Sequence, residues 1–386
     1  MNEIQSTIKE VKSQLIELSE YILENPELGN QEVKACKAHV ALLRKHGFVV
    51  EENYLGIETA FRAVYQGGKS GPRICYLSEY DALPEIGHGC GHNILGATST
   101  GAGIVLSKQV DEIGGSVIVF GTPAEETRGA KVTFADEGVF EDCDLAMVAH
   151  PSDNTYKSGQ SLAIEAIQFT FHGKTAHAAA SPHEGINALD AAINTFNHIN
   201  AMREHIRSDA RIHGIIKEGG QAANIVPDLA IAQFYVRATT KTYLKELVER
   251  VKNCARGASL AAGTSIEISN YEYTYDNLKT NQMLSELYSK NLILAGIEEV
   301  LEPSFNYGST DVGNVSHVCP TIHPYFRISL DPVVAHTVEF RDATKESYAY
   351  EQMEKTIAAL VATAVDVIED PVKLEAIQKE FQQTKA

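Results

Sequence analysis

The sequence is poor in basic residues. It has 33 lysines and arginines against 51 aspartates and glutamates in 386 residues, and its formal net charge is −18. Phosphates of nucleic acids and anionic membrane surfaces repel such a chain, which argues against either as a partner. A long apolar run is also missing, because no stretch approaches the roughly 18 residues that predict a membrane-spanning helix. The first residues, MNEIQSTIKEVKSQLIELSEYI, contain no apolar segment of the kind found in signal peptides.

Cysteine is scarce as well. The six cysteines are scattered along the chain rather than clustered as in a disulfide-stapled domain. We therefore expect a reduced, cytoplasmic setting, in which Cys90 is available as a thiolate. Hydrophobic residues make up 44% and charged residues 22% of the chain, as in ordinary globular proteins, and the length predicts two domains.

The first half of the sequence predicts an α/β fold. Apolar residues spaced three and four apart from Ile4 to Ile22 predict an amphipathic helix, and a second helix is expected from about Glu32 to His46. Short apolar runs at 73–78, 116–121 and 144–150 then alternate with helical patterns, which is typical of a mixed, largely parallel sheet covered on both faces. Residues 1–50 and 277–305 carry no recognisable chemistry, and we expect them to be scaffold.

After Gly159 the pattern changes to strand, helix, strand, strand, helix, strand. This order is that of ferredoxin-like α+β domains, and it predicts a domain inserted at 161–276. The segments 1–160 and 277–386 then form one discontinuous domain, in which a final helix is expected near Tyr350 to Glu369.

Residues 79–93, EYDALPEIGHGCGHN, combine acids, histidines and a cysteine with turn-forming glycines. Two interpretations are open. Either Cys90 is a nucleophile with His88 or His92 as its base, or Cys90 and His92 form half of a metal site. A Cys-x-His pair alone is a weak signal, because such pairs on loops usually have no function.

Residues at two further strand ends favour the metal site. Glu125 and Glu126 follow the second apolar run through a Gly-Thr-Pro turn, and His150 ends the third. The carboxyl ends of parallel strands share one edge of a sheet, so we expect these side chains to lie near Cys90. In an adjacent pair of acids one carboxylate can bind metal while the other accepts a proton from water. Two exposed surface acids are the alternative interpretation.

Four more residues are candidates for function. His177 lies among small residues in GKTAHAAASP, which leaves space for a ligand. Asn224 in GGQAANIVPD and Arg237 on the following strand offer an amide and a guanidinium, which suit an oxyanion and a substrate carboxylate. His336 in VVAHTVEF is a candidate for a further metal ligand. Each of His177, Asn224 and Arg237, taken alone, is more often structural than functional.

The order and spacing of YDALP, GHGCGHN, TPAEE, GKTAHAAASP, AANIVPD, GSTDVGNVS and AHTVEF make the sequence resemble the M20 family of metallo-peptidases and amidohydrolases over essentially its whole length. It looks most like the branch that contains aminobenzoyl-glutamate hydrolase and the aminoacylase-like amidohydrolases. The resemblance implies a zinc-peptidase-like catalytic domain with a smaller lid domain through which a homodimer forms. It also implies one or two divalent ions per subunit, zinc or manganese. Many relatives have a histidine ligand where this chain has Glu79, which leaves the number of ions open.

The resemblance also implies a role for each candidate. The metal-ligand positions are those of Cys90, His92, Glu126, His150 and His336. Glu125 occupies the position of the general base, and Asp81 that of the acid that orients the site. His177, Asn224 and Arg237 occupy lid positions that stabilise the oxyanion and hold the substrate carboxylate. Whether His177 acts in its own subunit or in a partner subunit stays open.

The expected activity is metal-dependent hydrolysis of the amide bond of an N-acyl or aroyl amino acid with a free carboxylate, such as aminobenzoyl-glutamate. Glu125 is expected to activate the attacking water and to return its proton to the leaving amine. Three alternatives remain: a metallo-dipeptidase on the same scaffold, a cysteine hydrolase that uses Cys90, and a non-catalytic binding protein derived from the enzyme. The sequence decides neither the acyl group nor the amino acid.

Overall fold

The computed structural model describes residues 1–303 and 308–385, and its internal contacts divide the chain into two units. The first unit contains Met1–Gln160 and most of the described residues from Leu278 onward. The second unit contains Ser161–Asn277 together with residues 308–310. Part of the segment 277–305 that we expect to be scaffold, residues 304 and 305, lies outside the described residues. Within the described residues, no helix has the length and apolar character needed to span a bilayer.

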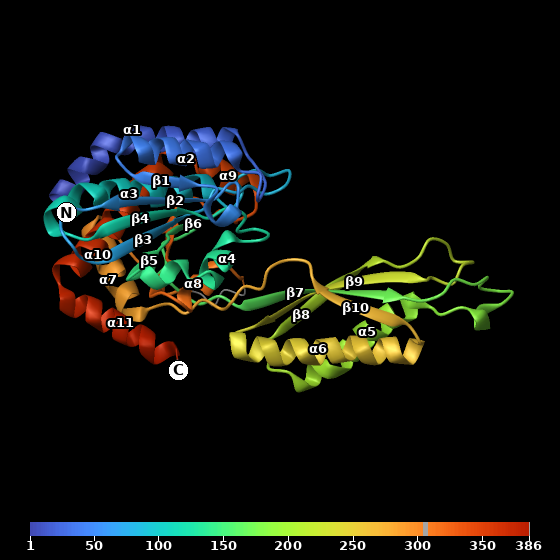
Figure 1. The fold of residues 1–386 in the computed structure, drawn as a ribbon. Coiled ribbons are helices and arrows are strands. Elements are labelled where there is room, and N and C mark those ends of the chain that lie inside the picture. The colour runs from blue at the N-terminus through green and yellow to red at the C-terminus, as the bar shows by residue number, and fades with distance from the viewer. Residues whose placement is uncertain (304–307, 386) are drawn as a thin grey trace. The chain divides into compact units, whose positions relative to one another are not determined.

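Most helices and strands of the first unit are labelled in Figure 1. Its helices are α1 (Asn2–Glu24), α2 (Val33–Lys45), α3 (His92–Ile113), α4 (Ala130–Asp136), α7 (Gln282–Leu294), α8 (Val312–Ser316), α9 (Val338–Ala343), α10 (Ser347–Glu369) and α11 (Pro371–Lys385). Its strands are β1 (Val49–Glu52), β2 (Phe61–Gln66), β3 (Arg73–Ser78), β4 (Ser116–Gly121), β5 (Leu145–Met147), β6 (His150–Ser152), β11 (Thr321–Ile322) and β12 (Tyr325–Arg327).

Six of these strands form one sheet in the order β1-β2-β4-β3-β5-β11. Strands β4, β3, β5 and β11 are parallel, whereas β1 and β2 are antiparallel to their neighbours, which confirms the expected mixed, largely parallel sheet. Ile74 and Tyr76 of β3 belong to one hydrophobic core and Cys75 and Leu77 to another, on the opposite face. Burial on both faces explains why RICYLS is a continuous apolar run.

The predicted helix over 4–22 is α1, and the predicted strands at 73–78 and 116–121 are β3 and β4. The prediction of a third strand at 144–150 is only partly confirmed, because β5 stops at Met147 and His150 begins a separate strand, β6. The prediction that His150 ends the third strand is therefore wrong. Strand β5 pairs with β11 and β6 with β12, and Pro324, which has no amide hydrogen, separates the two partner strands.

A disulfide joins Cys75 and Cys143, whose Cα atoms are 6.4 Å apart. The expectation of reduced thiols is wrong for this pair, whereas Cys90 is free. Cys75 lies on β3, and Cys143 lies two residues before β5, the neighbouring strand. The sheet thus brings together two cysteines separated by 68 residues, a proximity that their scattered positions in the sequence do not reveal.

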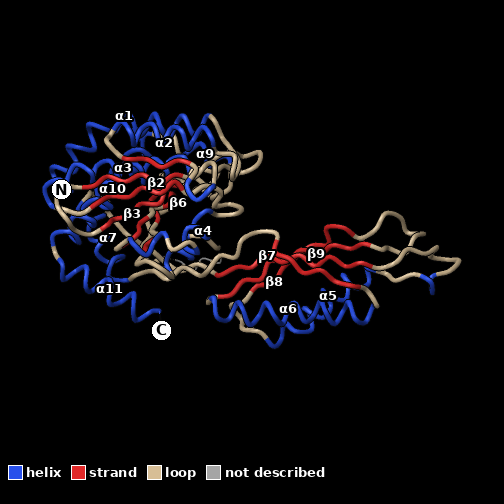
Figure 2. The backbone as a smooth tube through the Cα atoms, in the orientation of Figure 1, coloured by secondary structure: helices blue, strands red, loops and turns tan. Residues whose placement is uncertain are grey.

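The second unit consists of β7 (Ala163–His172), α5 (Ala188–Met202), β8 (Arg211–Glu218), β9 (Leu229–Ala238), α6 (Lys241–Ala262) and β10 (Ser265–Asn270). This order is the predicted ferredoxin-like one. The strands form an antiparallel sheet in the order β10-β7-β9-β8, and α5 and α6 lie along one of its faces (Figure 2). Phe169, Phe234 and Leu247 are in the core between the sheet and the helices. A lid or dimerisation role for this unit remains a prediction.

Candidate active site

The segment that follows β3 turns sharply before α3. Gly91 precedes α3 with φ of +78°, a conformation that favours glycine. A Cβ atom on Gly91 would lie 2.6 Å from Cγ of Pro151, so the close approach also requires glycine. The turn makes His92 the first residue of α3 and places Cys90 beside β6, where Pro151 follows His150.

Asp81 orients His92. Its carboxylate accepts a hydrogen bond from Nδ1 of His92 at 2.9 Å, which leaves Nε2 of the same ring 3.4 Å from the carboxylate of Glu79. Burial by itself lowers the pKa of His92, but Cys90 and Asp81 outweigh it and raise the pKa well above its usual value. Asp81 and His92 are both buried, so the orientation of the ring is fixed.

Cys90 faces His150. The distance from Sγ of Cys90 to Nε2 of His150 is 3.5 Å, and Nδ1 of His150 donates to the carbonyl oxygen of Pro151 at 2.7 Å. Burial and the neighbouring His323 and His92 lower the pKa of His150 to about 3, so the ring is neutral and Nε2 is free to act as a ligand. Burial raises the pKa of the Cys90 thiol.

The two glutamates lie on a tight turn after β4. The backbone N–H of Glu126 donates to Asp81 at 3.0 Å, and the Glu126 carboxylate lies 3.4 Å from Nε2 of His336. The backbone of His336 donates to Gly89 at 2.8 Å, which brings the C-terminal histidine to the 79–93 segment. Burial, together with the charges of Glu126 and other acids, raises the pKa of Glu125 well above its usual value.

The ligand atoms of these side chains lie within 4.8 Å of one another in three overlapping groups. The groups are Cys90–His92–His150, Cys90–Glu126–His336 and His92–Glu125–Glu126. Thiolate sulfur, imidazole nitrogen and carboxylate oxygen are the donors that zinc and related ions take in proteins. All five predicted ligand residues and the predicted base therefore come together in the first unit.

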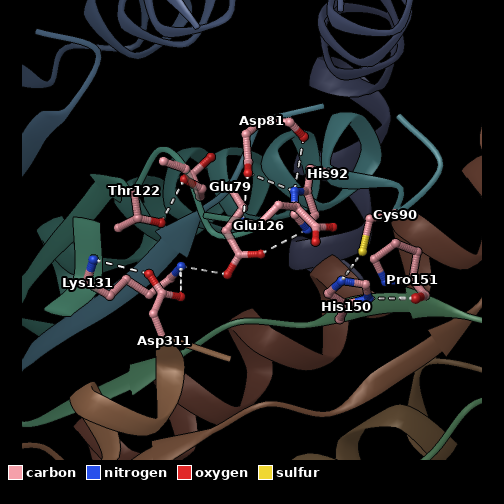
Figure 3. A network of polar contacts seen from close by, with 12 residues as sticks. Glu79, Asp81, Cys90, His92, Thr122, Glu126, Lys131, His150, Pro151 and Asp311 are labelled. Atoms are coloured by element: carbon pink, nitrogen blue, oxygen red, sulfur yellow. Dashed lines mark hydrogen bonds and ion pairs between the residues drawn. The ribbon is translucent and has the colours of Figure 1, made fainter. Parts of the chain in front are cut away.

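A buried ion-pair network adjoins this cluster (Figure 3). Nζ of Lys131, on α4, lies 2.9 Å from Glu79 and 2.7 Å from Asp311. The pKa of Glu79 falls to about 2, because Lys131 and His92 outweigh the effect of burial. Figure 3 shows Lys131 and Asp311 at one end of the network and Cys90 at the other, with Glu79 and His92 between them.

The sequence prediction missed Lys131, Asp311 and the buried His323, whose ring centroid lies 5.5 Å from that of His150. Asp311 lies inside the quoted stretch GSTDVGNVS, which was one available signal. Lys131 had none, because its two acidic partners are distant in the sequence.

The remaining predicted residues lie in the second unit. His177 and Asn224 are exposed and neighbours: the N–H of Ala178 donates to the carbonyl oxygen of Asn224 at 3.0 Å. Arg237 lies apart from them on β9, where it donates to Ser309 at 3.1 Å. Their predicted roles in catalysis and substrate binding remain predictions.

Known proteins resemble this chain over most of its length. The Xaa-Arg dipeptidase of Mus musculus is 37% identical over 393 residues, which cover 97% of this chain and 90% of the dipeptidase. One of the p-aminobenzoyl-glutamate hydrolase subunits of Escherichia coli K12 is 34% identical over 289 residues, which cover 68% of this chain and 59% of that protein. A family model described as the peptidase dimerisation domain matches residues 164–261.

The fold is also found among solved structures. The YXEP protein of Bacillus subtilis, described as a dinuclear metal binding peptidase from the M20 family, matches with a TM-score of 0.67 and 19% identity, and the match covers 92% of this chain and 99% of that one. The fold and the relatives define a peptidase or amidohydrolase. The chain belongs to the M20 family, as the motifs of the sequence suggested.

Proposed function

We propose that this enzyme is a metal-dependent hydrolase that cleaves the amide bond before a terminal amino acid with a free carboxylate. The observation that carries the proposal is the proximity of five side chains whose ligand atoms lie within a few ångströms of one another in overlapping groups: Cys90, His92, Glu126, His150 and His336. Glu125 lies beside them, on the same turn as Glu126.

These residues fit a divalent ion. The donor set mixes one thiolate, three imidazoles and a carboxylate, and the orientation of His92 is fixed by Asp81, as is usual for metal-binding histidines. The thiolate favours zinc, and manganese is the second choice. When bound, such an ion polarises a carbonyl group and makes water a better nucleophile at neutral pH.

Glu125 is the general base. It accepts a proton from the attacking water while the new C–O bond forms, and it delivers that proton to the nitrogen as the C–N bond breaks. Burial and the charge of Glu126 raise the pKa of Glu125, which makes its carboxylate a stronger proton acceptor. The carboxylate of Asp81 accepts hydrogen bonds from Nδ1 of His92 and from the backbone N–H of Glu126, so one carboxylate orients both of these residues.

For the substrate, His177 is proposed to stabilise the oxyanion, and Asn224 and Arg237 to hold the carboxylate. Dipeptides and N-acyl or aroyl amino acids share this carboxylate and differ on the other side of the amide. Dipeptides are favoured by the likeness to the Xaa-Arg dipeptidase over 97% of the chain. The match of 164–261 to a dimerisation domain supports a homodimer formed through the second unit.

The proposal is tested by measuring hydrolysis of a dipeptide panel, including C-terminal arginine, and of aminobenzoyl-glutamate. Each assay is run on protein of known metal content, with and without a chelator. Cleavage that a chelator abolishes and zinc or manganese restores is the expected result. Cleavage that resists the chelator but is lost on alkylation of Cys90 would instead support a cysteine hydrolase. Bound metal without cleavage of any of these compounds would refute the substrate class.

A further inference from the structure

The loop between α1 and α2 contains a glutamate whose side chain is buried, Glu32. Glu32 directly precedes α2, a position from which side chains usually cap their own helix, but it makes no such bond. Its carboxylate instead accepts the N–H of Ala124 at 2.8 Å and the hydroxyl of Thr59 at 2.9 Å. The loop between α1 and α2, which we expected to be scaffold, is thus hydrogen-bonded to the turn that carries Glu125 and Glu126.

Ala124 needs such a restraint. Its φ is +64°, in the left-handed region that residues other than glycine rarely adopt. Its carbonyl oxygen accepts the N–H of Thr127 at 3.0 Å, so Ala124 opens the tight turn that contains Glu125 and Glu126. Because Ala124 is fully buried, its N–H depends on the carboxylate of Glu32 for a partner. A conformation of this kind persists only where the surroundings fix it.

The loop lies directly against this turn. A Cβ atom on Gly29 would lie 2.7 Å from Oγ1 of Thr127 and 3.0 Å from Cβ of Ala124. The carbonyl oxygen of Glu27 accepts the N–H of Ala82, the residue after Asp81, at 2.9 Å. The loop therefore contacts the backbone beside the orienting aspartate and the turn that carries the base.

We infer that Glu32 is a positioning residue for the hydrolysis, because it fixes the turn that aims Glu125 and Glu126. The role in hydrolysis rests on the proposed function, whereas the restraint on the turn does not.

Three variants separate this role from general stability. Glu32→Leu removes both acceptors, while Glu32→Gln keeps an oxygen for the N–H of Ala124 and an amide that can donate to Thr59. Asn291→Leu is the matched control, because it also replaces a buried polar side chain that makes two hydrogen bonds, at 3.1 and 2.9 Å, to Thr363 and Asp366.

Hydrogen exchange in metal-free protein, read on a peptide covering residues 121–128, reports on the turn itself. Steady-state kinetics on the best substrate of the panel report on the base. For Glu32→Leu we expect faster exchange confined to the turn and a loss in kcat of about 10- to 100-fold, with KM changed less than about threefold. Glu32→Gln should have nearly the exchange rate and kcat of the wild-type protein, and Asn291→Leu should leave both the exchange at the turn and kcat unchanged.

Unchanged exchange at the turn in Glu32→Leu would overturn the inference. The inference would also be overturned if Glu32→Leu and Glu32→Gln had the same kcat, or if Asn291→Leu lost as much kcat as Glu32→Leu. If Glu32→Leu does not fold, Glu32→Ala removes the same two acceptor oxygens, and normal exchange at the turn together with a normal kcat in that variant would overturn the inference. If the wild-type protein hydrolyses nothing with zinc or manganese, the proposed function fails, and exchange still decides whether Glu32 holds the turn.

Discussion

Replacement of the buried Lys131 should destabilise the first unit strongly. Its side chain has no exposed surface, and its ammonium group lies between the carboxylates of Glu79 and Asp311, at 2.9 and 2.7 Å. Replacing Lys131 with methionine keeps most of the volume and removes the charge. The two buried carboxylates then lose the ammonium group that they share, and breaking a buried pair in this way costs about 3–5 kcal/mol.

The measurement is urea unfolding of the metal-free protein in chelator, so that metal binding to the native state does not add to its stability. In a thermal scan, the same cost corresponds to a fall in Tm of roughly 6–20 °C. The control is Asp311→Asn, introduced both into the wild-type protein and into Lys131→Met. It should destabilise the wild-type protein but cost less in Lys131→Met, where it removes one of two repelling charges, and the difference measures the coupling between the two residues.

A loss below about 1 kcal/mol in Lys131→Met would refute the reasoning, because it would mean that the remaining carboxylates become neutral or reach water at little cost. Equal effects of Asp311→Asn in both backgrounds would show that the two side chains are not coupled.

Three further predictions concern the site and the loop beside it. Burial and Asp81 raise the pKa of Glu32 from 4.5 to about 7. The stability that Glu32 contributes is therefore complete below pH 4.5 and is lost as the pH rises to 7. Urea unfolding at several pH values should show the free energy of unfolding of the wild-type protein, relative to Glu32→Gln, falling by up to about 3 kcal/mol over this range. Glu125→Gln should lower kcat by about 100- to 10,000-fold while metal content, measured by mass spectrometry, is kept; unchanged turnover would refute its role as base. Asp81→Asn should weaken metal binding by about 10- to 100-fold in calorimetry, because an amide keeps only one of the two carboxylate oxygens that accept from His92 and Glu126; unchanged affinity would contradict this.

Much of the fold could be predicted because its signals are local. The run RICYLS gave β3 with its observed bounds, since a strand buried on both faces is apolar throughout. Spacing of apolar residues gave α1, whose buried face includes Ile4, Ile8 and Val11. Strands β1 and β2 were not predicted. Both are antiparallel at one edge of the sheet, and β1 is largely exposed, so it lacks a strong apolar signal.

The site was predictable where chemistry is concentrated in short stretches. Cys90, His92 and the Glu125–Glu126 pair lie in segments that follow strands β3 and β4, which the sequence identified. The structure places His150 beside Cys90, but on β6 rather than at the end of the third predicted strand, because pairing between distant segments decides where β5 ends and β6 begins.

By itself, the sequence determined the alternation of elements, the inserted ferredoxin-like unit and the residue types able to bind a metal, since apolar periodicity and ligand chemistry are properties of short segments. Only the tertiary structure decided which charges are neutralised and which turns are restrained. Lys131 finds its partners at Glu79 and Asp311, and Glu32 finds Ala124 across 92 residues of chain. These contacts depend on how the sheet folds distant segments together, and a buried charge or amide must find its partner wherever the fold places one.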